Sequence, residues 1–163
     1  MKTLYIVRHA KSSWDAPDLN DLDRPLNDRG EKDAPRMGKR LKERNVTPGA
    51  VYSSPAVRAF STAKLIVDAI GSPSHSIHIK RALYHADAES LLRVVHAAND
   101  NADSIMIVGH NPGLTEFAND LLNEFIDNIP TAGVVAAQLK INSWKNAVMG
   151  CGTLLFFDFP KNK

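Results

Sequence analysis

The chain has very little cysteine: Cys151 is the only one among 163 residues. A single thiol excludes a disulfide within the chain, and a free thiol is typical of a protein in the reducing cytoplasm. A long hydrophobic run is also missing, because the apolar stretch at residues 4–7 ends at Arg8 and His9. That stretch is too short for a signal peptide or a membrane span. We therefore expect a cytoplasmic protein with no membrane partner.

Neither sign of charge dominates, since 20 Lys and Arg stand against 18 Asp and Glu. No Lys/Arg run with interleaved aromatic residues is present, so nucleic acid is not an expected partner. Residues 1–80 nevertheless carry 14 Lys and Arg and 9 Asp and Glu. This excess favours an anionic ligand on the N-terminal side, although a mixed solvated surface explains it equally simply.

Repeats, low-complexity tracts and a linker are absent too, which predicts one domain over residues 1–163. Hydrophobic periodicity predicts strands over 3–7, 50–52, 77–79, 105–108, 134–141 and 153–159, with helices over about 28–44, 55–70, 88–98 and 112–122. Strands that alternate with helices and end in a hairpin-like pair predict an α/β fold. We expect a three-layer α/β/α sandwich around a mostly parallel, mixed sheet.

The four helices each have a candidate start. The capping candidates are Asn27, Ser53 or Ser54 followed by Pro55 at the first helical position, Asp87, and Asn111 followed by Pro112. Pro35 should bend the first helix. The polar segment 11–28 has no periodicity, and irregular connections of this length are usually functional or disordered.

Four residues that could do chemistry follow predicted strands: Arg8, His9, Arg58 and His110. Ligands of open α/β sheets bind at the carboxyl ends of the strands. Arg58 lies in the first turn of its helix, and helical side chains lean back toward the N-terminus, so its guanidinium can reach that edge. Helix N-termini and arginine forks both favour an anion such as a phosphoryl group. In the alternative interpretation, Arg8 forms a purely structural ion pair with a carboxylate in segment 11–28.

The sequence resembles the histidine phosphatase superfamily, which also contains the cofactor-dependent phosphoglycerate mutases, and within it the short SixA-like phosphohistidine phosphatases. The matching segments, spread over residues 5–133, are YIVRHAKSSWD, DRPLNDRG, VYSSPAVRAFSTA, IVGHNPG and PTAG. Each segment is modest alone, but together they are specific. The resemblance implies a phosphoglycerate mutase-like fold.

The resemblance also implies roles for five residues. His9 becomes the nucleophile that is transiently phosphorylated, and Arg8, Arg58 and His110 form a cationic clamp on the phosphoryl group, with Ser12 lining the same pocket. Phosphoryl transfer needs chiefly an in-line nucleophile and preorganised positive charge, so these roles make chemical sense. Neither a metal nor another cofactor is expected. The implied substrate is phosphohistidine on a protein, for example on a histidine phosphotransfer domain.

The sequence departs from the superfamily pattern in three places. Ala10 replaces the usual glycine, which suggests that the position tolerates a methyl group. Asp15 stands where mutases tend to carry a phosphate-binding asparagine, and its charge would repel phosphate unless Lys11 neutralises it. The mutase-type catalytic glutamate is missing from a neighbourhood whose candidate acids are Tyr84, His85 and Asp87, with Asp87 better explained as a helix cap.

Other functions remain open at this point. A small-molecule phosphomonoesterase of the same superfamily is the main alternative. A metallohydrolase would need the histidines as ligands, but His75 and His78 form the only close pair outside the motifs, and they fall in a weak strand or loop. Isolated histidines such as His85 and His96 are more often structural or surface residues. A phosphate-binding protein without activity would need the arginines but not His9, and a mutase would need segments that this short chain lacks.

Overall fold

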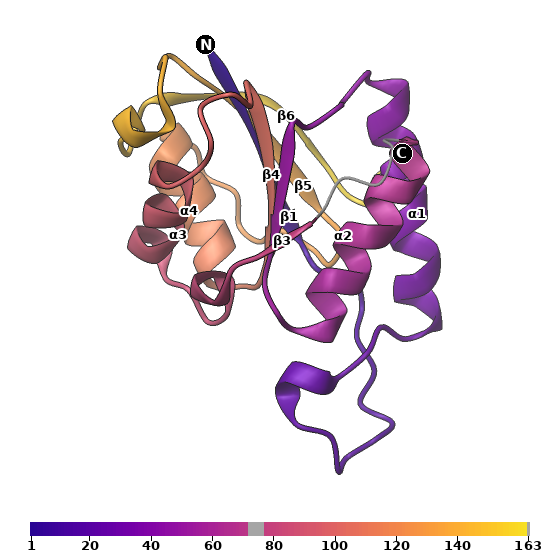
Figure 1. The fold of residues 1–163 in the computed structure, drawn as a ribbon. Helices are drawn as coiled ribbons and strands as arrows, with labels where there is room; N and C mark the ends of the chain where they lie inside the picture. The colour runs from indigo at the N-terminus through magenta and orange to yellow at the C-terminus, as the bar shows by residue number, and fades with distance from the viewer. Residues whose placement is uncertain (72–76, 163) are drawn as a thin grey trace.

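The computed structural model describes residues 1–71 and 77–162. A six-stranded sheet lies between two helix pairs, with α1 and α2 on one face and α3 and α4 on the other (Figure 1). The predicted three-layer α/β/α fold is therefore confirmed. The elements in chain order are β1 (Lys2–Arg8), η1 (Asp21–Asp23), α1 (Asp28–Glu43), β2 (Ala50–Ser53), α2 (Val57–Ile70), β3 (His78–Ile79), η2 (Arg81–Leu83), α3 (Ala88–His96), β4 (Ser104–Gly109), α4 (Gly113–Leu122), β5 (Val134–Leu139), η3 (Trp144–Asn146) and β6 (Gly152–Asp158).

The sheet is mixed and mostly parallel, with the strand order β3–β2–β4–β1–β5–β6. The pairs β1–β4, β2–β4 and β2–β3 are parallel, whereas β5 runs antiparallel to both β1 and β6. The expected antiparallel pair at one edge is thus confirmed. Because β1, β2 and β4 are parallel neighbours, their carboxyl ends meet at one edge of the sheet.

Two hydrophobic clusters fill the spaces between the layers. Leu4 and Ile6 of β1 pack in the cluster that includes residues of α3 and α4, whereas Tyr5 and Val7 pack in the cluster of α1 and α2. This alternation follows from the two-residue period of a strand. Neither face of β1 meets water, which explains its almost continuous run of apolar residues. Among the described residues, no helix is long and apolar enough to cross a membrane.

Two of the predicted helix caps are confirmed. The Asn27 side chain accepts a hydrogen bond from the Gly30 backbone N–H, and the Asp87 side chain accepts one from Ser90. Both bonds satisfy an amide that the first turn leaves without a partner. Helix α1 continues through Pro35 to Glu43, and α3 ends at His96, two residues before the predicted end.

The predicted start of α2 is wrong. Pro55 is not helical, and α2 begins at Val57 with Ala56 as its cap residue. The Ser54 hydroxyl does not cap the helix: its Oγ accepts a hydrogen bond from the Ala56 N–H and lies 2.8 Å from Nε2 of His110. The serine that the sequence suggested as a cap therefore holds a histidine of the candidate site.

The start of α4 differs in a similar way. Pro112 is the cap residue and not the first helical one, which is Gly113. The Asn111 side chain still serves this turn, because its Oδ1 accepts hydrogen bonds from the backbone N–H and the hydroxyl of Thr115.

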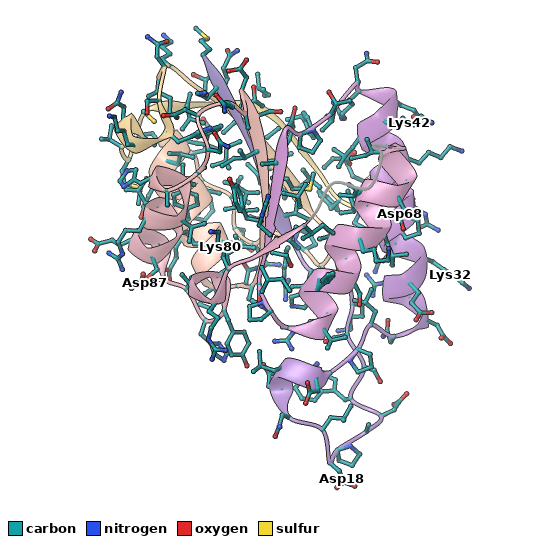
Figure 2. All side chains as sticks on the ribbon, viewed as in Figure 1. Asp18, Lys32, Lys42, Asp68, Lys80 and Asp87 are labelled. Atoms are coloured by element: carbon teal, nitrogen blue, oxygen red, sulfur yellow. The ribbon has the colours of Figure 1, made fainter. Side chains whose placement is uncertain are left out.

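The irregular segment 11–28 forms a loop whose two ends meet. The Lys11 carbonyl accepts a hydrogen bond from the Asn27 N–H at 3.0 Å, and Ser12 and Leu26 form an antiparallel bridge. Asp18 lies at the tip, away from the sheet (Figure 2). The short helix η1 interrupts the loop and places Asp21 beside α2, so the loop becomes one wall of the site described next.

Candidate active site

The carboxyl ends of the parallel strands border a cavity of about 300 Å³. It brings together all five predicted site residues, although they come from the end of β1, the loop 11–28, the first turn of α2 and the end of β4. Its lining consists of Arg8, His9, Lys11, Ser12, Trp14, Asp21, Arg24, Arg58, His85, His110, Asn111 and Thr131.

His9 follows β1 directly and is held on both sides. Its backbone N–H donates to the Gly109 carbonyl at 3.1 Å, which ties it to the end of β4. Its ring Nδ1 lies 2.7 Å from the Ala10 carbonyl oxygen. A carbonyl oxygen only accepts, so Nδ1 carries the proton and Nε2 keeps its lone pair. His9 therefore presents the tautomer that a nucleophile at Nε2 requires.

The environment of His9 keeps this ring neutral. Burial lowers the His9 pKa to about 4, and the positive charges of Arg58, Arg8 and Arg24 act in the same direction against the hydrogen bond to Ala10. Removing water and adding nearby positive charge both disfavour a protonated imidazole. The nucleophilic form of His9 consequently predominates at neutral pH.

Arg8 has no carboxylate partner among the residues that the structure describes, so the structural ion pair that we considered for it is not formed there. Its Nη1 donates to the Ile129 carbonyl at 3.0 Å, and its Nε is buried without a partner in the described chain. Burial also lowers the Arg8 pKa. A buried guanidinium that lines a cavity and lacks a counter-charge is suited to an anionic ligand.

Arg58 lies in the first turn of α2, as predicted, and only 5% of the residue is exposed. Its Nη1 donates to the Asp21 backbone carbonyl at 2.6 Å, and its Nη2 donates to Oδ2 of Asp21 at 2.9 Å. The guanidinium is thus fixed in direction by the loop 11–28.

His110 connects Arg58 with β2. Nη2 of Arg58 lies 3.5 Å from Nδ1 of His110, and Nε2 of His110 lies 2.8 Å from the Ser54 hydroxyl. An arginine only donates, so Nδ1 accepts and Nε2 carries the proton. Burial, together with the charges of His9 and Arg58, lowers the His110 pKa to about 3. The ring is therefore neutral here, and a dianionic phosphoryl group beside it would favour the cation that the resemblance implied.

Sequence reasoning missed Asp21. Its Oδ2 accepts hydrogen bonds from Arg58 and, at 2.6 Å, from the Tyr84 hydroxyl, while its Oδ1 accepts one from Arg24 at 3.0 Å. These donors hold the Asp21 pKa well below its usual range, with the Tyr84 bond as the largest cause. Asp21 is accordingly a carboxylate that orients two arginines.

Arg24 was missed as well, and 8% of it is exposed. Besides Asp21, it donates to the Ser12 hydroxyl and to the Ser13 carbonyl, and its guanidinium carbon lies 3.3 Å from the centre of the Trp14 ring. Arg24 belongs to the DRPLNDRG segment that carried the resemblance, so that segment is the sequence signal that could have identified it. Ser12 lines the cavity as predicted, but Arg24 engages its hydroxyl.

The structure also places the residues at which the sequence departs from the superfamily pattern. Asp15 is exposed and does not line the cavity, so it does not oppose a phosphoryl group there. Lys11 lines the cavity and makes no ion pair with Asp15. Asp87 is the helix cap, and the Tyr84 hydroxyl is bonded to Asp21.

Within residues 1–71 and 77–162, no three His, Cys, Asp or Glu side chains are placed to hold a metal ion. His78, one of the pair considered as metal ligands, lies against Tyr52. Nε2 of His96 lies 2.7 Å from the Ala147 carbonyl oxygen. His75 lies outside the described residues.

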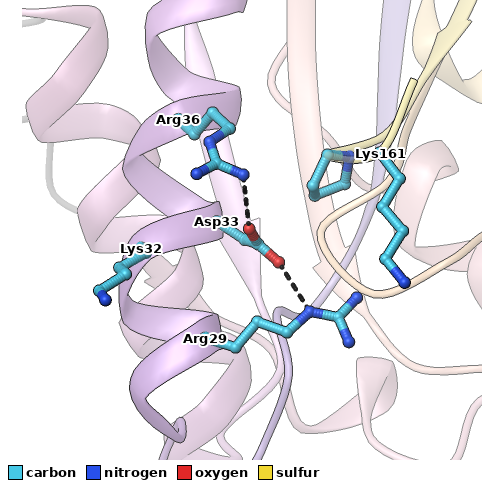
Figure 3. A pocket seen from close by; sticks show the side chains of 6 residues that line it. Arg29, Lys32, Asp33, Arg36 and Lys161 are labelled. Atoms are coloured by element: carbon cyan, nitrogen blue, oxygen red, sulfur yellow. Dashed lines mark hydrogen bonds and ion pairs between the residues drawn. The ribbon is translucent and has the colours of Figure 1, made fainter. Parts of the chain in front are cut away.

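A different cavity, of about 410 Å³, lies beside α1 and is also rich in cations. Asp33 is buried there, and one of its oxygens pairs with Arg29 and the other with Arg36, each at 3.3 Å (Figure 3). Lys32 points away from this pair in the same view. The arginine charges are partly neutralised and no nucleophile is near, so the cavity at His9 is the better candidate.

Comparisons with known proteins identify the family of the chain. Residues 4–91 match the family model of the histidine phosphatase superfamily (branch 1). An uncharacterised chloroplastic protein of Arabidopsis thaliana is 31% identical over 90% of this chain and 70% of its own length. A 2,3-bisphosphoglycerate-dependent phosphoglycerate mutase of Bifidobacterium longum is 40% identical over 40% of this chain and 28% of its own.

Solved structures show the same fold. A protein of Agrobacterium tumefaciens assigned as the phosphohistidine phosphatase SixA superposes with a TM-score of 0.81 at 26% identity, covering 98% of each chain. The protein histidine phosphatase SixA complexed with tungstate gives the same TM-score at 24% identity over 97% of each chain. The family model spans more than half of the chain, from β1 into α3. The chain is a SixA-like member of the histidine phosphatase superfamily, branch 1.

Proposed function

We propose that the protein hydrolyses phosphohistidine on a protein through a phosphorylated His9. The observation that carries the proposal is the unprotonated Nε2 of His9 in a cavity that three guanidinium groups line, those of Arg8, Arg24 and Arg58. In the first step Nε2 attacks phosphorus and the bond to the leaving nitrogen breaks. In the second step water attacks phospho-His9 and releases phosphate.

Positive charge for both steps comes from the arginines. Preorganised cations stabilise the charge that spreads over the three outer oxygens of the phosphoryl group. Arg8 lacks a counter-charge in the described chain, and Arg58 is already oriented by Asp21. This arrangement supports catalysis that requires no metal, so turnover should survive a chelator.

The state of the carboxylate supports the choice of substrate. Asp21 is the one carboxyl group among the described residues that line the cavity, and its hydrogen-bond donors keep it ionised. It cannot serve as a carboxylic acid toward a leaving oxygen. An imidazole needs less help, because it departs as a neutral molecule once its other nitrogen holds a proton.

The rim of the cavity suits a protein-bound substrate. Trp14 is 73% exposed and His85 is exposed, so the cavity meets solvent beside them. A phosphohistidine that projects from a folded protein, such as a histidine phosphotransfer domain, can enter from this side. The structural likeness to the Agrobacterium tumefaciens protein assigned as SixA supports the same substrate class.

The test is a comparison of substrates with purified protein. We expect kcat/KM for a phosphohistidine protein to exceed that for a sugar phosphate by at least about a hundredfold, because an alkoxide leaves far less readily than an imidazole and the ionised Asp21 cannot protonate it. Chelator should leave the rate unchanged. Equal or reversed preference would favour a small-molecule phosphomonoesterase, and binding of one phosphate without turnover would indicate a phosphate-binding protein.

A further inference from the structure

His85 stands between the candidate active site and an adjoining cavity. It lines the cavity of about 300 Å³ that holds His9, and it also lines a neighbouring one of about 200 Å³ with Asp87, His110 and Glu116. The arginines fix where the phosphoryl group binds, and the adjoining space can take the group to which it is attached. The bond that breaks would then lie close to His85.

The backbone conformation and the packing of its ring hold His85 at the border of the two cavities. Its φ is +54°, in the left-handed region that is uncommon for residues other than glycine, although asparagine, aspartate and histidine occupy it more often than the rest. Its ring packs on Tyr84 with the ring centres 3.9 Å apart, and Tyr84 is anchored through its hydroxyl to Asp21. Such uncommon conformations persist where the surroundings enforce them, and they concentrate at functional sites. The Asp21 carboxylate therefore positions both Arg58 and the Tyr84 ring on which His85 packs.

Four titratable groups beside His85 already have a role or a partner of their own. His9 is the proposed nucleophile, and His110 is neutral with both ring nitrogens bonded to Ser54 and Arg58. Asp21 is ionised. The Tyr84 hydroxyl already donates to Asp21, and desolvation together with this bond raises the Tyr84 pKa.

Three further titratable groups lie nearby but do not replace His85. Glu116 lines only the adjoining cavity and not the one that holds His9. Asp87 caps α3 through Ser90, an interaction that lowers the Asp87 pKa and keeps the carboxyl ionised. Lys11 lines only the first cavity, next to the loop 11–28, and does not border the adjoining one. By contrast, neither ring nitrogen of His85 has a hydrogen-bond partner in the described chain.

We propose that His85 is the proton donor to the leaving group, an inference that rests on the proposed phosphatase reaction at His9. As Nε2 of His9 forms its bond to phosphorus, the bond from phosphorus to the leaving atom breaks and its electron pair takes the proton of the His85 imidazolium. Neutral His85 then accepts a proton from the water that attacks phospho-His9. Phosphate leaves, and His85 is again protonated for the next turnover.

This role extends the substrate range of the site. An alkyl phosphate releases a strongly basic oxygen, so it depends fully on a proton donor. An aryl phosphate with an acidic phenol depends on one very little. Phosphohistidine lies between them, because its second ring nitrogen can take the proton from His85 or from water. We thus expect a slower phosphomonoesterase activity beside the phosphohistidine phosphatase, with His85 responsible for it.

The test uses His85→Asn, because asparagine tolerates a positive φ but its amide is not an acid. Rates are compared on phenyl phosphates whose phenols differ in acidity and on phosphoserine. The control is His78→Asn, on the edge strand β3 against Tyr52 and outside the cavity lining. We expect His85→Asn to reduce kcat/KM for phosphoserine by about 10² and for nitrophenyl phosphate by less than about threefold, with His78→Asn unchanged on both.

A loss of equal size on every substrate would overturn the role of His85, whether it arises from misfolding or from substrate binding. Retained turnover of nitrophenyl phosphate shows that the variant is folded. The outcome is separable from that of the proposed function. If the wild type ignores a phosphohistidine protein yet His85→Asn shows the leaving-group dependence, the substrate proposal fails and the role of His85 stands.

Discussion

The carboxylate of Asp21 holds the guanidinium of Arg58, with Oδ2 and Nη2 2.9 Å apart. The two residues are 37 positions apart in sequence and belong to η1 and α2. The Asp21 backbone carbonyl accepts a second bond from the same guanidinium at 2.6 Å. Two bonds from one residue fix both the position and the plane of Arg58, so the loop 11–28 orients a side chain of the candidate active site.

Replacing Asp21 distinguishes its effect on the positions of Arg58 and Arg24 from the effect of its negative charge in the cavity. We expect Asp21→Ala to lower kcat by between about 10- and 100-fold, because Arg58 and Arg24 lose their shared partner and small misplacements are costly in catalysis. Inorganic phosphate should inhibit this variant more strongly than the wild type, since a negative charge has left the cavity. Steady-state kinetics with phosphate as inhibitor measures both effects.

Asp21→Asn is the matched variant, because the amide oxygen can still accept from Arg58 while the charge is lost. It should gain phosphate affinity as Asp21→Ala does, but keep more of kcat. Unchanged kcat in Asp21→Ala would show that Arg58 does not need this partner.

The covalent step predicts a phosphoenzyme. Phosphorus bonded to the Nε2 of His9 should survive base and be lost in acid, as expected for a phosphoramidate. Rapid mixing with labelled phosphoprotein should trap it transiently on the wild type, and His9→Ala should abolish both the label and turnover. Near-normal turnover by His9→Ala would remove His9 from the mechanism.

The clamp residues should affect the chemical step more than binding. We expect Arg58→Ala and His110→Ala each to lower kcat by about 10² to 10³, the usual effect of losing one preorganised transition-state donor. Single-turnover rates check this directly. If only KM rises, the two residues bind ground state and transition state equally, and the assignment to the clamp is wrong.

The sequence was a good guide to the fold and to the centre of the site. The strands β1 and β4 are buried on both faces and so appear as uninterrupted apolar runs, which made them easy to predict. Arg8, His9 and His110 follow those runs directly, so their meeting at one sheet edge follows from parallel pairing. The predicted caps Asn27 and Asp87 depend only on local bonds and were also right.

Features that depend on tertiary contacts could not be predicted in the same way. Ser54 looked like a helix cap because serine often is one, but its hydroxyl is bonded to His110, 56 positions away. Asp21 and Arg24 lie in a loop without periodicity, where the sequence gives no orientation. Their roles become visible only when the loop closes through the bond between Lys11 and Asn27 and brings them against α2.

The pKa of His9 gives a prediction for the pH profile. Nucleophilic attack requires the neutral ring, and the His9 pKa of about 4 means that this form predominates at any pH above that value. The kcat/KM, corrected for ionisation of the substrate, should rise with pH up to about 4 and show no further increase from His9 near 6.5, where an ordinary histidine titrates. Because positive charge from Arg58 contributes to the low value, Arg58→Ala should move the rise to higher pH, whereas His78→Asn should not. Titration of the His9 ring by NMR from about pH 3 to 8 measures the same equilibrium without substrate, and a midpoint near 6.5 in the wild type would contradict the buried, cation-lined setting from which the mechanism is derived.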